Sequence, residues 1–200
     1  MFSDDGKIRI LYTGSINLKT RNPSPLFEAV RLISLSKNSK YLERLEIIFI
    51  GQNVEILKEL VHKFSVEKWV SIQPERPRAD ILAMQTQTSI LLFLEVNNPK
   101  IPGVLTGKLF EYLNAKRPIW GIGIDETTSS GKLILNAQSG RLFGTSVELI
   151  QDALLKILTT NTNEEFTPNV SLIEQFNRDK ITQKLSLLLE KTLRNERNNN

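Results

Sequence analysis

Short apolar runs that alternate with amphipathic stretches constrain the fold of this chain more than any other feature of its sequence. Residues 45–50 and 90–94 are apolar at nearly every position, which is typical of strands covered on both faces of a parallel sheet. The predicted strands are residues 8–13, 45–50, 69–72, 89–96, 118–122 and 141–143, and the predicted helices are residues 25–36, 54–64, 79–85, 107–114, 130–137 and 147–158. This alternation predicts an α/β fold with a doubly wound, Rossmann-like parallel sheet of about six strands.

The polar stretch after the last of these helices divides the chain. Residues 1–160 are expected to form one domain, and residues 161–168 a polar connector. Residues 169–197 carry apolar positions at helical spacing and are predicted to form a final helix that packs on the domain, with residues 198–200 disordered. Within the domain, Asn53 and Ser146 are predicted helix N-caps, and Pro25 is expected at an early helix position.

Composition removes several kinds of chemistry. The chain has 200 residues, no cysteine and one histidine, which excludes disulfide scaffolds, cysteine metal sites and thiol catalysis and argues against Ser-His-Asp hydrolysis. No cluster of Asp, Glu and His has ligand spacing, so no bound metal is expected. The net charge of +4 is scattered along the chain and indicates no nucleic-acid partner. A polar, acidic start and the lack of a bilayer-length apolar run predict a cytoplasmic protein.

In such a sheet, ligands bind beyond the carboxyl ends of the strands, against helix N-termini. The loop and helix around residues 100–114 carry the most informative signal of this kind. Thr106 is expected to cap the helix, which leaves the amides of Gly107 and Lys108 available to a phosphate. Gly107 also permits close approach of a ligand to the backbone.

Glu111 lies one helical turn beyond Gly107. A carboxylate at that distance from bound phosphates can accept hydrogen bonds from both hydroxyls of a nucleotide ribose. An ion pair between Glu111 and Lys108 at i,i+3 is the alternative interpretation. The nearby Gly-Lys pairs at 107–108 and 131–132 are each followed by leucine instead of Ser or Thr, so neither is a P-loop. No Gly-x-Gly-x-x-Gly follows the first strand either, which argues against a nicotinamide or flavin dehydrogenase.

The segment 106–119, Thr-Gly-Lys-Leu-Phe-Glu-Tyr-Leu-Asn-Ala-Lys-Arg-Pro-Ile, resembles the donor-site motif of retaining glycosyltransferases with the GT-B fold, the family 4 or group 1 enzymes. Five further segments resemble segments of that family and occur in the same order along the chain: residues 8–16, 45–51, 70–74, 80–84 and 89–94. The helix around Phe176 resembles the family's closing helix. The similarity covers most of the chain and corresponds to the carboxy-terminal, donor-binding half of such an enzyme.

The resemblance implies a role for each candidate residue. It makes Glu111 the group that holds the donor ribose and directs the amides of Thr106, Gly107 and Lys108 to the diphosphate. It places Gly14 and Ser15 close to the phosphates and makes Arg21, with Lys19 as a competitor, the cation that stabilises the leaving group. It places Gln73 at the start of the base-contacting loop, with a surface turn before Pro74 as the alternative.

Two positions depart from the family pattern. The family has a first glutamate eight positions before the ribose glutamate, where this chain has Gly103, and many members have Arg where this chain has Ser15. The catalytic group is therefore unknown, and Glu95 and Arg21 are the weak candidates.

The resemblance further implies a UDP-, GDP- or dTDP-sugar as donor, no cofactor or metal, and a glycan or lipid-linked acceptor in polysaccharide or cell-envelope biosynthesis. An amino-terminal acceptor-binding domain is expected as a partner in cis or in trans, because this chain alone should transfer sugar poorly. A lipid-linked acceptor would favour peripheral contact of the final helix with the inner face of the membrane. The alternative function is a non-catalytic Rossmann-like module that binds a nucleotide or a protein. A flavodoxin-like or receiver-type domain is disfavoured, since no acidic cluster ends the first strand.

Overall fold

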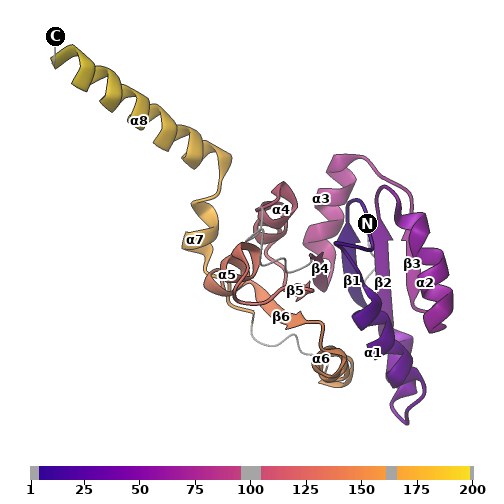
Figure 1. The fold of residues 1–200 in the computed structure, drawn as a ribbon. Helices are drawn as coiled ribbons and strands as arrows, with labels where there is room; N and C mark the ends of the chain where they lie inside the picture. Colours follow the sequence, from indigo (N-terminus) through magenta and orange to yellow (C-terminus); the bar gives the residue numbers. More distant parts are fainter. Residues whose placement is uncertain (1–4, 96–104, 161–165, 199–200) are drawn as a thin grey trace. The chain divides into compact units, whose positions relative to one another are not determined.

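The computed structural model describes residues 5–95, 105–160 and 166–198. The chain divides into two compact units, Met1–Pro168 and Asn169–Asn200. The first unit contains β1 (Ile8–Thr13), α1 (Ser24–Ser34), η1 (Ser39–Arg44), β2 (Leu45–Ile50), η2 (Val54–Ile56), α2 (Leu57–Phe64), β3 (Val70–Gln73), α3 (Arg78–Gln87), β4 (Ile90–Leu94), α4 (Gly107–Ala115), β5 (Ile119–Ile122), α5 (Ser129–Asn136), β6 (Gly140–Gly144) and α6 (Val147–Thr160) (Figure 1). The second unit contains α7 (Val170–Glu174) and α8 (Arg178–Asn198).

The six strands form one parallel sheet in the order β3-β2-β1-β4-β5-β6. This arrangement confirms the predicted doubly wound α/β fold. The winding reverses between β1 and β4, so the carboxyl ends of these two strands lie side by side and leave a crevice where the loops diverge. β1 pairs with β2 along its whole length, from Ile8 to Thr13. Its pairing with β4 covers only Ile10 and Leu11.

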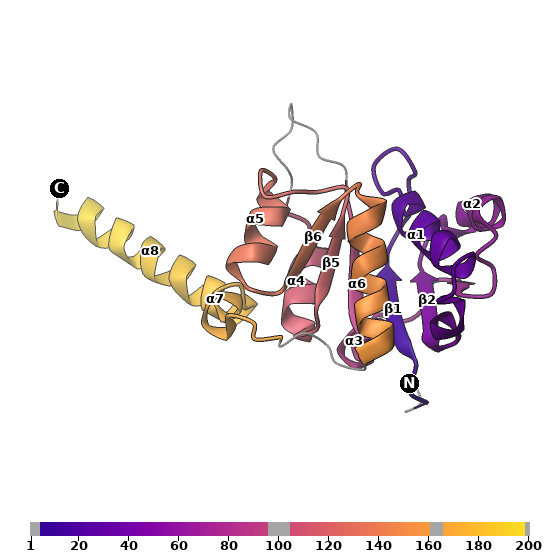
Figure 2. The same ribbon diagram turned by 90° about the horizontal axis from the view of Figure 1, so that it is seen from below.

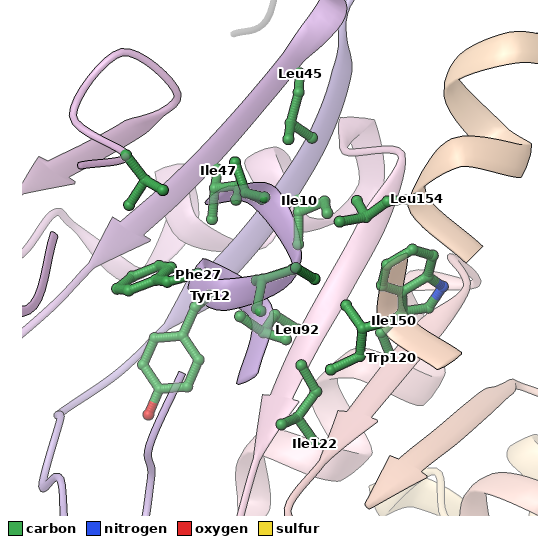
Figure 3. Packing of buried hydrophobic residues seen from close by; sticks show 14 of the residues in the cluster. Ile10, Tyr12, Phe27, Leu45, Ile47, Leu92, Trp120, Ile122, Ile150 and Leu154 are labelled. Atoms are coloured by element: carbon green, nitrogen blue, oxygen red, sulfur yellow. The ribbon is translucent and has the colours of Figure 1, made fainter. Parts of the chain in front are cut away.

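Helices cover both faces of the sheet. α1 and α6 pack together over one face, and α3 and α4 lie over the other (Figures 1 and 2). The side of the core under α1 and α6 includes Ile10, Tyr12 and Leu92, all fully buried (Figure 3). Because side chains alternate along a strand, the intervening residues face α3 and α4, where the Phe93 ring packs against Tyr112 of α4. Burial on both faces explains why these strands lack a polar alternation.

The predicted elements are all present, with changes at their ends. The predicted helix at 54–64 begins as the 3₁₀ segment η2, and η1 was not anticipated. Asn53 occupies the predicted N-cap position, at the start of η2, but its side chain forms no capping hydrogen bond. Its backbone is left-handed, with φ of 56°, a conformation that asparagine tolerates better than most residues. Ser146 does cap α6, since its Oγ accepts a hydrogen bond from the Leu149 amide at 3.2 Å. Pro25 lies in the first turn of α1, as expected.

The predicted final helix is divided into α7 and α8. The Asn177 carbonyl accepts from the Ile181 amide at 3.0 Å, and α8 starts at this point. Asparagine favours helix starts over helix interiors, which explains the break. None of the helices in the described parts of the chain combines the length and apolarity that crossing a membrane requires.

Candidate functional site

Two adjacent cavities open at the carboxyl ends of β1 and β4. The first has a volume of about 440 Å³ and extends toward β2 and α3, with walls that include Gly51, Gln52, Glu75, Arg78 and Glu111. The second has a volume of about 520 Å³ and extends toward β4, with walls that include Thr20, Arg21, Phe93, Glu95 and Thr106. Gly14, Ser15 and Lys108 line both. The two cavities therefore meet at the winding reversal of the sheet.

Glycines at the ends of β1 and β2 allow the floor of the first cavity to form. Gly14 has φ of 120° and Gly51 has φ of 146°, conformations that other residues rarely adopt. The Gly14 amide donates to the Ile50 carbonyl at 2.8 Å. A Cβ added at Gly51 would lie 2.4 Å from the Gly14 carbonyl oxygen. The two loops thus approach each other too closely for a side chain at Gly51.

Lys108 extends from the first turn of α4 across Gly14, so that a Cβ added at Gly14 would lie 2.9 Å from its Nζ. Nζ donates a hydrogen bond to the Tyr12 hydroxyl at 2.9 Å and lies 4.0 Å from the centre of the Tyr12 ring. Burial, followed by repulsion from Arg21, lowers the pKa of Lys108 to about 7, although Glu111 and Glu95 act in the opposite direction. The lysine amine therefore loses its charge far more easily than an exposed lysine does.

Glu111 faces the first cavity from α4. Its carboxylate forms an ion pair with the Arg78 guanidinium of α3 at 2.6 Å, and its side chain is 28% exposed. The alternative in which Glu111 merely pairs with Lys108 is therefore wrong, because the Lys108 amine points to Tyr12 and Arg78 occupies the carboxylate. The carboxylate stays at the cavity wall, where a diol can reach it.

Arg21 lies at the second cavity. Its guanidinium donates to the Ser15 hydroxyl at 3.0 Å and to the Ser15 carbonyl at 3.3 Å. The Ser15 carbonyl also accepts from the Tyr12 hydroxyl at 2.7 Å. Figure 3 shows this hydroxyl pointing away from the aliphatic core. The structure thus joins Arg21, Ser15, Tyr12 and Lys108 in one hydrogen-bonded chain between the cavities.

Glu95 follows β4 and also lines the second cavity. Its carboxylate accepts a hydrogen bond from the Ser130 hydroxyl of α5 at 2.6 Å, and Ser130 is buried. Glu95 is therefore a positioned carboxylate on the side of the site away from Glu111. Gly103, the position of the family's first glutamate, lies outside the described residues.

Two residues differ from their expected local arrangement. Thr106 occupies the predicted N-cap position of α4, but its side chain forms no capping hydrogen bond. The Thr106 side chain lines the second cavity instead of accepting from the first turn. The first amides of α4 consequently have no side-chain cap. A Cβ added at Gly107 would meet no atom within 4 Å, so the space beside this residue is open.

Gln73 ends β3 but lines neither cavity. Its side chain donates to Ser71 at 3.0 Å and accepts from Arg76 at 2.8 Å. Gln52 and Glu75, which sequence analysis did not single out, lie at that end of the first cavity and are joined by a hydrogen bond of 3.1 Å. Each is the second residue after a strand, and this position is the sequence signal that could have identified it.

A buried network holds α4 against the end of β1. The Tyr112 hydroxyl accepts from the Thr13 amide at 3.0 Å. The Thr13 hydroxyl accepts from the Gln85 amide group of α3 at 3.0 Å. Burial raises the pKa of Tyr112 to about 12, so this phenol remains protonated. Because Lys108 and Glu111 are on the same helix, the network fixes their distance from Gly14.

No model of a protein family and no curated protein matches this chain in sequence. Solved structures match its fold. The pneumococcal O-GlcNAc transferase GtfA in complex with UDP and GlcNAc matches with a TM-score of 0.63 and 16% identity over 96% of this chain and 37% of that one. WaaG, a glycosyltransferase involved in lipopolysaccharide biosynthesis, matches with a TM-score of 0.59 and 16% identity over 88% of this chain and 48% of WaaG. The lipopolysaccharide outer core galactosyltransferase WaaB matches with a TM-score of 0.62 and 13% identity over 94% of this chain and 50% of WaaB.

These similarities show that the chain has the fold of a Rossmann-like half of a GT-B glycosyltransferase. The chain spans half or less of the length of each of the three proteins.

Proposed function

We propose that this chain is the donor-binding half of a retaining glycosyltransferase that uses a nucleotide-diphospho-sugar. The observation that carries the proposal is the pair of cavities that meet at Lys108, with a carboxylate on either side. A nucleotide sugar has the matching layout, since its diphosphate lies between a ribose and a sugar. The shared fold supports this assignment, and one of the proteins with that fold was solved with UDP and GlcNAc.

In the proposed complex the nucleoside occupies the first cavity. Glu111 accepts hydrogen bonds from the ribose hydroxyls, and the ion pair with Arg78 holds the Glu111 carboxylate in place. Gln52 and Glu75 lie where they can contact the base. The family's base-contacting position, Gln73, stays a prediction.

The diphosphate lies against the first turn of α4 and the side chains of Lys108, which crosses Gly14, and Arg21, which contacts Ser15. The amides of Thr106 and Gly107 have no side-chain cap and lie at the positive end of the α4 helix dipole, a position that favours an anion. Arg21 is held by Ser15 at the edge of the second cavity. As the bond between the sugar C1 and the phosphate oxygen breaks, Arg21 and these amides stabilise the negative charge that develops on the nucleoside diphosphate.

The sugar occupies the second cavity, where Glu95 is the available carboxylate. The acceptor hydroxyl forms the new bond to C1 as the bond between C1 and the phosphate oxygen breaks, and its proton passes to the departing nucleoside diphosphate. In this proposal an amino-terminal half binds the glycan or lipid-linked acceptor, since the three glycosyltransferases are at least twice as long as the part that this chain matches. Cationic groups and helix amides stabilise the leaving group without a metal.

A non-catalytic module is the second candidate, and one observation favours it. Glu111 is paired with Arg78, so the carboxylate has a structural partner that explains its presence. A module of this kind would bind a protein, or a nucleotide without transferring its sugar.

Calorimetric titration with UDP, GDP, dTDP and ADP separates these proposals. We expect one of these nucleotides to bind. Glu111→Gln should lower its affinity by roughly tenfold or more, because a charge-assisted hydrogen bond is lost. Glu59→Gln, at an exposed glutamate of α2 outside both cavities, is the matched control and should leave the affinity unchanged. Transfer activity, assayed with the amino-terminal half supplied, tests catalysis. Failure of every nucleotide to bind the folded chain, alone and with that half, contradicts the proposal and favours a protein-binding module.

A further inference from the structure

Lys108 is a largely buried lysine without a carboxylate partner. Its Nζ reaches the Tyr12 hydroxyl, and it forms no ion pair with any residue in the described ranges. Transferring an unpaired ammonium group from water into such a site is unfavourable unless a negative charge accompanies it. The position of Lys108 thus calls for either a neutral amine or an anion beside it.

Among the residues that the structure describes, each charged group that faces Lys108 has another partner. Arg21, from the loop after β1, adds a second positive charge and is held by Ser15. Glu111, on α4 itself, pairs with Arg78, and Glu95, after β4, accepts from Ser130. The remaining titratable neighbours, the Tyr12 and Tyr112 phenols, are buried and have raised pKa values, so they carry no charge.

The Lys108 side chain also divides the site. It lines both cavities, and it crosses directly above Gly14 at their junction. Any ligand that extends from Glu111 to Glu95 must pass over its Nζ. For a nucleotide sugar, the part of the ligand that passes there is the diphosphate.

We propose that Lys108 is the side chain on which the donor diphosphate binds, and that binding of the nucleotide is coupled to protonation of the Lys108 amine. This inference rests on the proposed function. Above about pH 7 the Lys108 amine is mostly neutral and packs on Tyr12 until the nucleotide binds. When the diphosphate arrives, Nζ takes a proton from solvent, and the resulting ammonium ion pairs with the phosphate oxygens.

The lowered pKa of the Lys108 amine, about 7 in the empty site, gives the pH range of the effect. At pH 8 about nine-tenths of the amine is unprotonated, and at pH 6 about one-tenth. Binding at pH 8 should therefore take up about 0.9 proton, and binding at pH 6 about 0.1. Above pH 7 the affinity should fall by up to about tenfold per pH unit.

The test measures proton uptake with intact nucleotide sugars. UDP-glucose, GDP-mannose and dTDP-glucose are suitable probes because both phosphates are esterified and keep their charge between pH 6 and pH 9. Titration calorimetry of the probe that binds, in HEPES and in Tris at each pH, gives the number of protons from the difference in buffer ionisation heat. The corresponding nucleoside, which lacks phosphates, is titrated in parallel.

Three variants define the expected result. Lys108→Met should abolish the proton uptake and weaken the nucleotide sugar by roughly tenfold or more at pH 6, yet leave nucleoside binding unchanged. Lys108→Arg should abolish the uptake and retain affinity, because arginine stays protonated. Lys132→Met, at an exposed lysine of α5, should change neither quantity. Thermal unfolding of each variant checks that it is folded.

The outcomes separate the two proposals. If Lys108→Met binds the nucleotide sugar as the wild type does, or still takes up a proton, the inference is overturned and the proposed function stands. Wild-type binding with no difference between HEPES and Tris at pH 8 overturns it as well. Lack of nucleotide-sugar binding by a folded wild-type protein, alone and with the amino-terminal half, overturns both.

Discussion

Replacing Lys108 with methionine should make the ligand-free protein more stable, by an amount that depends on pH. The pKa of the Lys108 amine is 10.5 without perturbation and about 7 in the folded protein. Between these values the unfolded chain binds more protons than the folded one, so the stability of the wild type rises with pH across this range. The destabilisation by Lys108 is complete below pH 7 and disappears above pH 10.5. Methionine keeps the apolar packing and removes the charge.

The size of the effect follows from the same two pKa values. Each pH unit well inside this range corresponds to about 1.4 kcal/mol, and because the amine is half protonated at pH 7, the advantage of Lys108→Met should shrink by about 2.3 kcal/mol from pH 7 to pH 9. Solvent at the open cavity wall reduces this, and we expect a measured change of about 1–2 kcal/mol. The loss of the hydrogen bond to Tyr12 contributes little, because the Tyr12 hydroxyl still donates to the Ser15 carbonyl.

Urea unfolding at intervals from pH 6 to pH 9, followed by circular dichroism, measures both free energies of unfolding. Lys132→Met serves as the control, because this lysine is exposed and lies outside both cavities. A difference between Lys108→Met and wild type that is constant over this pH range, or that grows with pH, would refute the argument that burial disfavours the charged lysine.

Three further perturbations test the architecture of the site. Tyr112→Phe removes the acceptor of the buried Thr13 amide and should lower the free energy of unfolding by about 1–3 kcal/mol. Tyr41→Phe, at a half-buried tyrosine of η1, should have little effect. Equal effects of the two variants in urea unfolding would contradict the role of the buried network. Gly51→Ala places a Cβ 2.4 Å from the Gly14 carbonyl oxygen and should lower the free energy of unfolding by more than about 2 kcal/mol. Gly107→Ala, whose Cβ enters open space, should lower it by less than about 1 kcal/mol. Similar melting temperatures for the two variants would exclude the close contact. EDTA should leave nucleotide affinity unchanged in calorimetry, because Lys108 and Arg21 supply the positive charge, and a marked loss would show that a metal is needed.

The sequence predicted the central strands best. The bounds of β1 and β2 match the prediction to the residue, because their apolar runs are closed by a glycine at one end and polar residues at the other. Of the shorter outer strands, β3 is shifted by one position, and β6 is one residue longer at each end than predicted. Their side chains are less buried, so the hydrophobic pattern that marks a strand is weaker there.

Most of the candidate residues line the two cavities, because each was chosen for its place after a strand or at the start of α4. Arg78, which pairs with Glu111, was missed. The pairing depends on α3 lying next to α4, which the chain order alone does not specify. The contact between Lys108 and Tyr12 joins residues 96 positions apart. Such long-range contacts, and the pKa shifts that follow from them, have no counterpart in a local pattern.

The narrow pairing between β1 and β4 has a consequence for folding and for exchange with solvent. The strands on one side of this seam come from the first 73 residues, and those on the other side from residue 90 onward. The two halves of the sheet can therefore form as separate cooperative units, joined last across the longest chain separations. Gly14 and Ser15 belong to one half, and Lys108 and Glu111 to the other. A ligand bound between these residues links the two halves of the sheet. Amide hydrogen exchange should therefore slow along β4 and α4 as well as at the groups that the ligand contacts.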